Sequence, residues 1–209
     1  MITVCWAAKG GSGTTVVAAA MAIAAGAPTL LIDLAGDVPA VLGIPEPDGP
    51  GVFDWLASDA SPARLTALEV RADGHANVLP RGRPAQATPE RWAELATWLR
   101  GERRSIVIDA GSTGEPPPAI VRAADHALLV TRPCYLALRA AVRRPTRPTG
   151  VVLVEEPGRA LRARDIEASL GVPVVVTVLL DPAIARAVDA GLLLARLPAG
   201  FRHAVRLAA

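Results

Sequence analysis

The fold is decided by Trp6-Ala7-Ala8-Lys9-Gly10-Gly11-Ser12-Gly13-Thr14-Thr15, a stretch of this 209-residue chain. An apolar run, residues 2–8, leads into three glycines, and the two threonines then open an alanine-rich segment with helical character. A strand, a glycine turn and a helix N-terminus in this order direct free backbone N–H groups and the helix dipole at an anion. The stretch therefore predicts a phosphate-binding loop.

Lys9 is the only lysine in the chain, and every other fixed positive side chain is an arginine. The presence of the single lysine at this turn indicates that the chemistry of the site requires a lysine side chain there. The standard phosphate loop, G-x-x-x-x-G-K-S/T, places its lysine directly before the hydroxyl residue. Thr14 occupies that position here. We expect a loop that cradles phosphates without its usual cation.

Apolar, β-branched runs alternate with helix-like segments along the chain, and several of these runs are continuously apolar, as in strands covered on both faces. This order predicts an α/β fold: a doubly wound, mostly parallel sheet of about seven strands with helices on both faces, in one domain over residues 1–209. Strands are predicted at residues 2–8, 29–34, 76–79, 105–110, 127–131, 150–154 and 173–179. Helices are predicted at residues 15–25, 50–57, 62–68, 89–100, 117–124, 136–143, 160–170 and 182–194.

Composition narrows the class of protein. Cys5 and Cys134 lie in strand-like runs and are interpreted as small buried side chains of a reduced, cytoplasmic protein. The longest apolar stretch, residues 16–27, is too short and too rich in alanine to span a bilayer, and no secretory signal is evident. We expect no stable membrane insertion, also because the weakly amphipathic stretch 201–207 is short.

A formal net charge of +2 does not by itself imply a nucleic-acid partner. The basic run formed by Arg139, Arg143, Arg144 and Arg147 has two interpretations. It is a contact surface for nucleic acid or for an acidic partner, or it is a solvated face, which the general use of arginine in this chain favours.

In this chain Lys9-Gly10-Gly11-x-Gly13 precedes the two threonines Thr14 and Thr15. This loop resembles that of the MinD/ParA family of deviant Walker ATPases, which implies a P-loop NTPase-like domain. Leu30-Leu31-Ile32-Asp33-Leu34 is similar to the second-strand motif of that family, and Ile106-Val107-Ile108-Asp109 to its Walker B strand. Residues 125–131 with 136–139 are similar to a further family segment. Within the family the likeness is greatest to the CpaE/TadZ branch, which helps to place pili and secretion machinery; residues 37–43, 78–80, 165–173 and 181–191 carry it.

The resemblance implies binding of ATP with Mg²⁺ by the loop Lys9, Gly10, Gly11, Ser12, Gly13, Thr14 and Thr15. It implies a nucleotide-sandwich homodimer in which Lys9 reaches the partner's phosphates. Thr15 would hold Mg²⁺, and Asp33 and Asp109 would support the metal and its water, since hydroxyl and carboxylate oxygens suit this hard cation. The implied catalytic residues are Lys9 and Asp33, and the implied metal residues are Thr15, Asp33 and Asp109.

The chain departs from the family pattern at three places. Thr14 replaces the second lysine, Ala35 replaces the second aspartate of D-x-D, and Glu155 or Glu156 replaces the asparagine expected to face adenine. Loss of one charge-stabilising group costs about 10²–10³-fold in rate. Two losses predict little or no hydrolysis, while nucleotide binding survives through the backbone N–H groups, Mg²⁺ and Lys9.

The favoured hypothesis is a nucleotide-binding positioning factor with weak or absent ATPase activity, which forms a homodimer and contacts a pilus, secretion or division machinery. An active ParA-type ATPase is the alternative, with Asp37 in place of the missing carboxylate; Asp37 is otherwise a helix cap or turn residue. A third hypothesis is an NAD-binding oxidoreductase, from Gly11-x-Gly13-x-x-Val16 and Asp33. It is disfavoured because Val16 occupies a glycine position and Lys9 is left unexplained.

Overall fold

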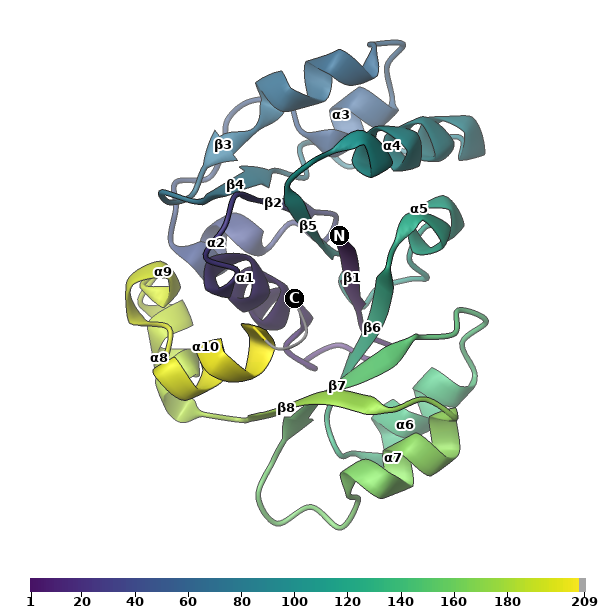
Figure 1. The fold of residues 1–209 in the computed structure, drawn as a ribbon, viewed down its shortest axis with the longest axis vertical. Helices are drawn as coiled ribbons and strands as arrows, with labels where there is room; N and C mark the ends of the chain where they lie inside the picture. The colour runs from purple at the N-terminus through teal and green to yellow at the C-terminus, as the bar shows by residue number, and fades with distance from the viewer. Residues whose placement is uncertain (207–209) are drawn as a thin grey trace.

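Across residues 1–206, which the computed structural model describes, eight strands form one sheet in the order β3-β4-β2-β5-β1-β6-β7-β8 (Figure 1). Every neighbouring pair in this part of the chain is parallel except β3 with β4. The predicted fold class, a doubly wound and mostly parallel sheet, is confirmed. The strands are β1 (Ile2–Trp6), β2 (Thr29–Asp33), β3 (Val70–Arg71), β4 (Ala76–Leu79), β5 (Ser105–Asp109), β6 (His126–Thr131), β7 (Gly150–Glu155) and β8 (Val174–Leu179).

Helices cover both faces of the sheet (Figure 1). The first layer consists of α1 (Thr14–Ala24), α2 (Val38–Leu42), α8 (Pro182–Asp189), α9 (Leu193–Arg196) and α10 (Ala199–Arg206). The second layer consists of α3 (Val52–Leu56), the 3₁₀ helix η1 (Pro62–Leu68), α4 (Pro89–Gly101), α5 (Pro118–Ala123), α6 (Tyr135–Val142) and α7 (Ala163–Leu170).

The central strand β1 is buried along its whole length, which accounts for its mostly apolar sequence. Its five residues are buried, and it lies between β5 and β6. Side chains alternate between the two faces of a strand, so Cys5 packs into the α1 layer while Val4 and Trp6 pack into the opposite layer. The two layers thus form two cores, which meet along this strand and fix the position of the loop that follows it.

In the α1 layer, the backbones of Gly43 and Gly191 lie in close contact. The predicted helix over residues 182–194 is wrong as one element, because the chain turns at Gly191, whose φ is +63°. A Cβ at Gly43, the left-handed residue that ends α2, would collide with the carbonyl oxygen of Gly191. This close backbone approach needs glycine at position 43, and the left-handed turn at Gly191 separates α8 from α9.

Three smaller predictions also differ from the structure. The sheet has one strand more than predicted: the two-residue strand Val70–Arg71 is too short for a hydrophobic pattern to identify. Cys134 is wrong as a strand residue, since it is half-buried directly before α6, whereas Cys5 is buried in a strand as expected. Residues 62–68 form a 3₁₀ helix at the predicted bounds.

The C-terminal helix α10 packs against α1 and β8 through the buried Val205. Leu207, the last residue of the stretch predicted to be weakly amphipathic, lies outside the described residues. Within residues 1–206 no helix has the length and apolar character needed to cross a membrane.

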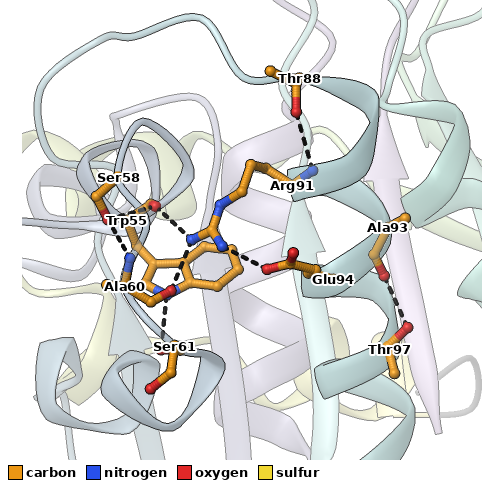
Figure 2. Close-up of polar contacts among 9 residues, drawn as sticks. All are labelled: Trp55, Ser58, Ala60, Ser61, Thr88, Arg91, Ala93, Glu94 and Thr97. Atoms are coloured by element: carbon orange, nitrogen blue, oxygen red, sulfur yellow. Dashed lines mark hydrogen bonds and ion pairs between the residues drawn. The ribbon is translucent and has the colours of Figure 1, made fainter.

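On the opposite face, Arg91 fastens α4 to the corner between α3 and η1 (Figure 2). Its guanidinium lies 3.8 Å from the centroid of the Trp55 ring and donates to the carbonyl oxygens of Trp55 at 2.9 Å and Ala60 at 3.0 Å. It also pairs with Glu94, while Thr88 caps the helix by accepting from the Arg91 N–H. The clamp therefore joins α3, η1 and α4 within the second layer.

Candidate functional site

Three strand ends and one helix start meet in the middle of the sheet. Asp33 and Asp109 end β2 and β5, and they are register partners on these adjacent strands. Cys5, near the end of β1, is the partner of Asp109 on the other side. The glycine loop follows β1 directly, so the chain order and the parallel register bring the loop and the two aspartates to the same edge of the sheet.

The loop between β1 and α1 has the conformation that its glycines predict. Gly11 and Gly13 adopt left-handed backbone angles, with φ of +76° and +86°. The Ser12 hydroxyl donates to the Lys9 carbonyl oxygen at 2.7 Å and closes the turn. A Cβ at Gly11 would meet no atom within 4 Å, so backbone conformation rather than crowding requires glycine there. The turn delivers Thr14 to the first position of α1.

A cavity of about 470 Å³ lies over this helix start, lined by hydroxyl, carboxylate and backbone groups together with apolar side chains; we call it the polar cavity because these polar groups gather there. Residues 11–16 form one wall, and Ala35, Asp37, Gly111 and Ser112 form part of the other. Thr14 and Ala35, two of the three positions where the chain departs from the motif it resembles, are both on the wall. Whatever occupies this cavity therefore meets a hydroxyl at position 14 and a methyl group at position 35.

A second, apolar cavity of about 260 Å³ continues from the first. The two share Gly13, Val16 and Val188 as lining residues. The additional wall of the apolar cavity comes from residues far along the chain: Val17, Val154, Leu179, Leu180, Asp181, Ile184, Ala185, Asp189 and Phe201. Sequence reasoning did not identify this wall as part of the site. The only signal was the family-like segment 181–191, which supplies part of it.

Asp109 and Thr15 lie together at the base of the loop. Asp109 is fully buried, and its Oδ1 accepts the N–H of Gly111 at 3.0 Å, while its Oδ2 has no hydrogen-bond partner among residues 1–206. Burial raises the pKa of Asp109 to about 6, although the Thr15 hydroxyl and the Gly111 N–H lower it in part. An unpartnered buried carboxylate oxygen beside a hydroxyl is a suitable donor pair for a hard divalent cation.

Among residues 1–206 no three His, Cys, Asp or Glu side chains converge as a metal cage. This is compatible with Mg²⁺, which characteristically takes one or two protein oxygens and completes its shell with phosphates and water. Thr15 and Asp109 fit that role. The cation would supply positive charge at the phosphates.

Asp33 is placed differently from Asp109. Its Oδ1 accepts the N–H groups of Ala35 at 3.0 Å and Gly36 at 2.6 Å, and its Oδ2 accepts that of Val38 at 3.2 Å. Burial raises the pKa of Asp33, and these three hydrogen bonds oppose the rise. The side chain faces its own loop and a separate cavity near Arg81, and it is not part of the wall of the phosphate-loop cavity.

Asp37 lies on that wall instead. It occupies the residue position directly before α2, yet its side chain makes no capping hydrogen bond; Asp33 accepts the N–H of the first helical residue, Val38, and Pro39 at the second position has no N–H to donate. Its backbone carbonyl accepts from Val41. The structure therefore brings Asp37 to the polar cavity with its carboxylate uncommitted.

Lys9 lies on the far side of the glycine loop. It is exposed, makes no ion pair among the described residues 1–206, and lines a smaller cavity of about 190 Å³ with Arg132, Cys134 and Arg159. Lys9 is not part of the wall of the polar cavity formed by its own loop. Its ammonium group is thus available outside the site that the loop encloses.

The glutamates expected near a base are not on the apolar cavity. Glu156 pairs with Arg132 at 2.7 Å and Arg159 at 2.9 Å, beside the cavity that Lys9 lines. Glu155 is not part of the wall of the apolar cavity either; Val154 is the residue of β7 that reaches it.

No protein-family model matches the sequence, and no curated protein matches it. Solved structures are similar in fold over nearly the whole chain. A ParA family ATPase from Chlorobium tepidum has a TM-score of 0.78 at 18% identity and covers 98% of this chain and 95% of its own. The septum site-determining protein MinD from Pyrococcus horikoshii, in complex with Mg-ADP, has a TM-score of 0.77 at 22% identity, with 100% and 95% covered.

MinD in the MinC:MinD cell division protein complex of Aquifex aeolicus gives a TM-score of 0.78 at 20% identity, with 99% and 93% of the two chains covered. Likeness at these identities establishes the fold. The architecture described above is that of these ATPases, and the chain spans almost their full length.

Proposed function

We propose that this chain is a MinD/ParA-type protein that binds ATP with Mg²⁺ and acts as a cytoplasmic positioning factor of the CpaE/TadZ kind. The observation that carries the proposal is that the two cavities adjoin and share Gly13, Val16 and Val188 as lining residues. One is polar and lies over a helix start, and the other is apolar. A nucleotide has the same division between phosphates and base. The Mg-ADP complex of the structurally similar MinD supports this choice of ligand.

The proposed binding mode uses few side chains. Backbone N–H groups of residues 10–15 and the dipole of α1 would hold the phosphates. Thr15 and Asp109 would hold Mg²⁺, directly or through water, and the cation would neutralise the buried carboxylate that has no partner. The base would lie between Val154 and the α8 residues Ile184 and Val188. Apolar contact of this kind gives affinity without strict selection of one base.

Hydrolysis would be weak or absent. Phosphoryl transfer depends on cations and oriented water at the transferred group. Thr14 and Ala35 offer neither a charge nor a carboxylate at the cavity wall. The chain would then act by binding, with nucleotide-dependent assembly as its output.

The proposed assembly is a homodimer formed over the loop. Lys9 is exposed and lines a separate cavity from the one over the helix start, which suits a contact with phosphates on a second copy. We also propose protein partners from a pilus, secretion or division machinery; the presence of MinC in the complex with a similar MinD chain supports protein partners in general.

One observation favours the second candidate, an active ATPase. Asp37 lies on the cavity wall with an uncommitted carboxylate, two residues after the alanine that replaces the family's aspartate. If Asp37 orients the attacking water and Lys9 acts across the dimer, the chain would turn over slowly. The two candidates share the binding site and differ only in the rate of phosphate release.

Titration calorimetry with ATP, ADP and NAD, each with and without Mg²⁺, tests the binding proposal. We expect Mg²⁺-dependent ATP binding that Thr15→Ala weakens by about tenfold or more. Thr97→Ala, which removes an exposed hydroxyl from α4 on the opposite face, is the matched control and leaves the affinity unchanged. Binding of NAD in preference to ATP, or equal affinities for both variants, refutes the proposal.

Steady-state phosphate release then separates the two candidates. A rate no higher than the background, with ATP-dependent dimerisation seen by light scattering and lost in Lys9→Ala, supports the positioning factor. Turnover above background that both Lys9→Ala and Asp37→Asn abolish supports the ATPase.

A further inference from the structure

The helix α6 presents an outward face that the nucleotide site does not use. The helix covers the sheet face opposite α1 and lies beside α7 (Figure 1). Its small residues Ala137 and Ala141 are buried against the core. Three outward residues are apolar and two are basic. We call them the α6 face: Tyr135, Leu136, Arg139, Val142 and Arg143.

These five residues form a single surface. At 3.6 residues per turn they fall within an arc of roughly 120° on the helix, with Tyr135, Arg139 and Val142 in one row and Leu136 with Arg143 in the next. All five are exposed. The apolar and cationic side chains are therefore interleaved on one side of two helical turns.

The apolar exposure is concentrated here. Tyr135 is 67% exposed, Leu136 56% and Val142 44%. They are three of the seven large exposed hydrophobic residues found among residues 1–206, although α6 has only eight residues. Single exposed apolar residues are ordinary, but a cluster rimmed by charge marks a contact surface.

The charge of the surrounding segment has one sign. From His126 to Val154 the sequence contains no aspartate or glutamate, while it contains five arginines. Arg132 and Arg144 are neutralised by Glu156 and Glu115. Among residues 1–206, no carboxylate lies within 4.0 Å of the remaining three: Arg139, Arg143 and Arg147. The α6 face thus carries unpaired positive charge between its apolar side chains.

We infer that the α6 face is a docking surface for a short acidic amphipathic segment of a partner protein. Carboxylates of the segment would pair with Arg139 and Arg143, and its apolar residues would cover Tyr135, Leu136 and Val142. The partner is chosen by complementarity, since charge fixes orientation and apolar burial supplies affinity.

Two other occupants fit less well. Nucleic-acid backbone would pair with the arginines but would leave Leu136 and Val142 against phosphate, where they gain nothing. A lipid surface would accept both kinds of side chain, yet a two-turn helix with three apolar residues offers too little area for stable interfacial binding. Of these three occupants, the acidic protein segment is the one that uses every residue of the face.

The α6 face lies outside both cavities of the nucleotide site, none of whose lining residues it shares. The inference therefore stands independently of the proposed nucleotide binding. Measuring ATP affinity on each variant below separates failure of one from failure of the other.

Peptide selection tests the inference. A random peptide library displayed on phage is selected on the full chain and then depleted on a variant with both Arg139→Glu and Arg143→Glu. We expect enriched peptides in which acidic residues accompany apolar residues at helical spacing. The best of them is synthesised with a fluorescent label and titrated against each variant, with thermal unfolding as the check that each variant is folded.

The expected affinities are specific. The double arginine variant should weaken peptide binding by about tenfold or more, and Leu136→Ser by a smaller factor, about threefold to tenfold. Arg64→Glu, the same charge reversal on an exposed arginine of η1, should leave binding unchanged. A peptide with its apolar residues replaced by serine should lose at least about tenfold.

Three outcomes would overturn the inference. In the first, the selection yields no acidic amphipathic peptide. In the second, the serine peptide binds as tightly as its parent. In the third, a labelled DNA duplex or vesicles of phosphatidylglycerol bind the full chain, this binding is lost in the double arginine variant, and the acidic peptide does not bind.

Discussion

The carboxylate of Asp33 accepts the backbone N–H of Val38 at 3.2 Å, so Asp33 caps α2 from five residues away, while Asp37 stands next to the helix and does not cap it. The same carboxylate also accepts the N–H groups of Ala35 and Gly36. Asp33 therefore shapes the loop that presents Asp37 to the polar cavity.

Asp33→Ala should lower the free energy of unfolding by about 1–3 kcal/mol, because three N–H groups lose their acceptor. Asp37→Ala should change it by less than about 0.5 kcal/mol, since the side chain is exposed and makes no capping bond. Urea denaturation measures both. Equal losses in the two variants would show that Asp37 is the structural residue.

The buried Asp109 should make stability depend on pH in an unusual direction. Its pKa is about 6 in the folded chain, above its ordinary value of 3.8, so the folded state binds more protons than the unfolded chain between these values. Stability should fall as pH rises through that window, by about 3 kcal/mol for this group, and remain lower above it.

Asp109→Asn should flatten this part of the pH profile and raise stability at neutral pH relative to the parent. Thermal unfolding from pH 4 to 8, without and with Mg²⁺ and ATP, measures the effect. Ligand should reduce the pH dependence of the parent chain by stabilising the ionised carboxylate. A parent profile as flat as that of the asparagine variant would contradict the placement of Asp109.

Thr14→Lys restores the missing cation at a position already on the wall of the polar cavity. A lysine there would reach phosphate from the first residue of α1, so ATP affinity should rise by about tenfold or more. Calorimetry measures the change, with Thr97→Lys on α4 as the control for added charge. Unchanged affinity would mean that the loop does not hold phosphate at Thr14.

Gly43→Ala should be costly because two effects add. The residue has a left-handed backbone, which costs about 1–2 kcal/mol for a residue with a Cβ, and the new methyl group would collide with Gly191. Gly171→Ala is the matched control: that glycine also ends a helix with φ of +70°, but its Cβ would meet no atom within 4 Å. Unfolding free energies should differ by at least about 1 kcal/mol, and similar values would rule out the collision.

Arg91→Ala should remove the clamp on the second layer. It deletes the stacking on Trp55 and removes the donor to the Ala60 carbonyl oxygen, while the Trp55 carbonyl oxygen keeps the Ser58 N–H and hydroxyl as donors; the cost should be about 1–3 kcal/mol (Figure 2). Glu94→Ala removes only a half-exposed ion pair and should cost less than about 1 kcal/mol. Denaturant unfolding compares the two, and a larger loss in Glu94→Ala would contradict this account.

Sequence periodicity was sufficient for seven of the eight strands described and for most of the longer helices, because the central β-branched runs are buried on both faces and several helices begin at a proline. The two-residue strand β3 and the short helices α2 and α10 were not predicted. The glycine loop was also predictable, since a left-handed backbone at Gly11 and Gly13 restricts the residue type. Hydrophobic periodicity and the glycines of a turn are local properties, so they can be predicted from one sequence.

Side-chain direction was less accessible. The strand end identified Asp33 as a site candidate, but the backbone N–H groups that turn its carboxylate away depend on the path of the following loop. The apolar cavity joins Val16 to Leu179 and Phe201, which are far apart in the chain. The break at Gly191 depends on the backbone of Gly43. Each of these features arises from tertiary contacts that no local pattern specifies.

The exposed Lys9 has a practical consequence. Because it is the only lysine, it carries the only side-chain primary amine in the chain, so an amine-reactive reagent reports on this one position and the α-amino group. Acylation kinetics read by mass spectrometry would therefore show directly whether this amine becomes shielded when ATP is added. For the same reason, enzymes that acetylate or otherwise modify lysine side chains have one possible target residue in this chain, Lys9.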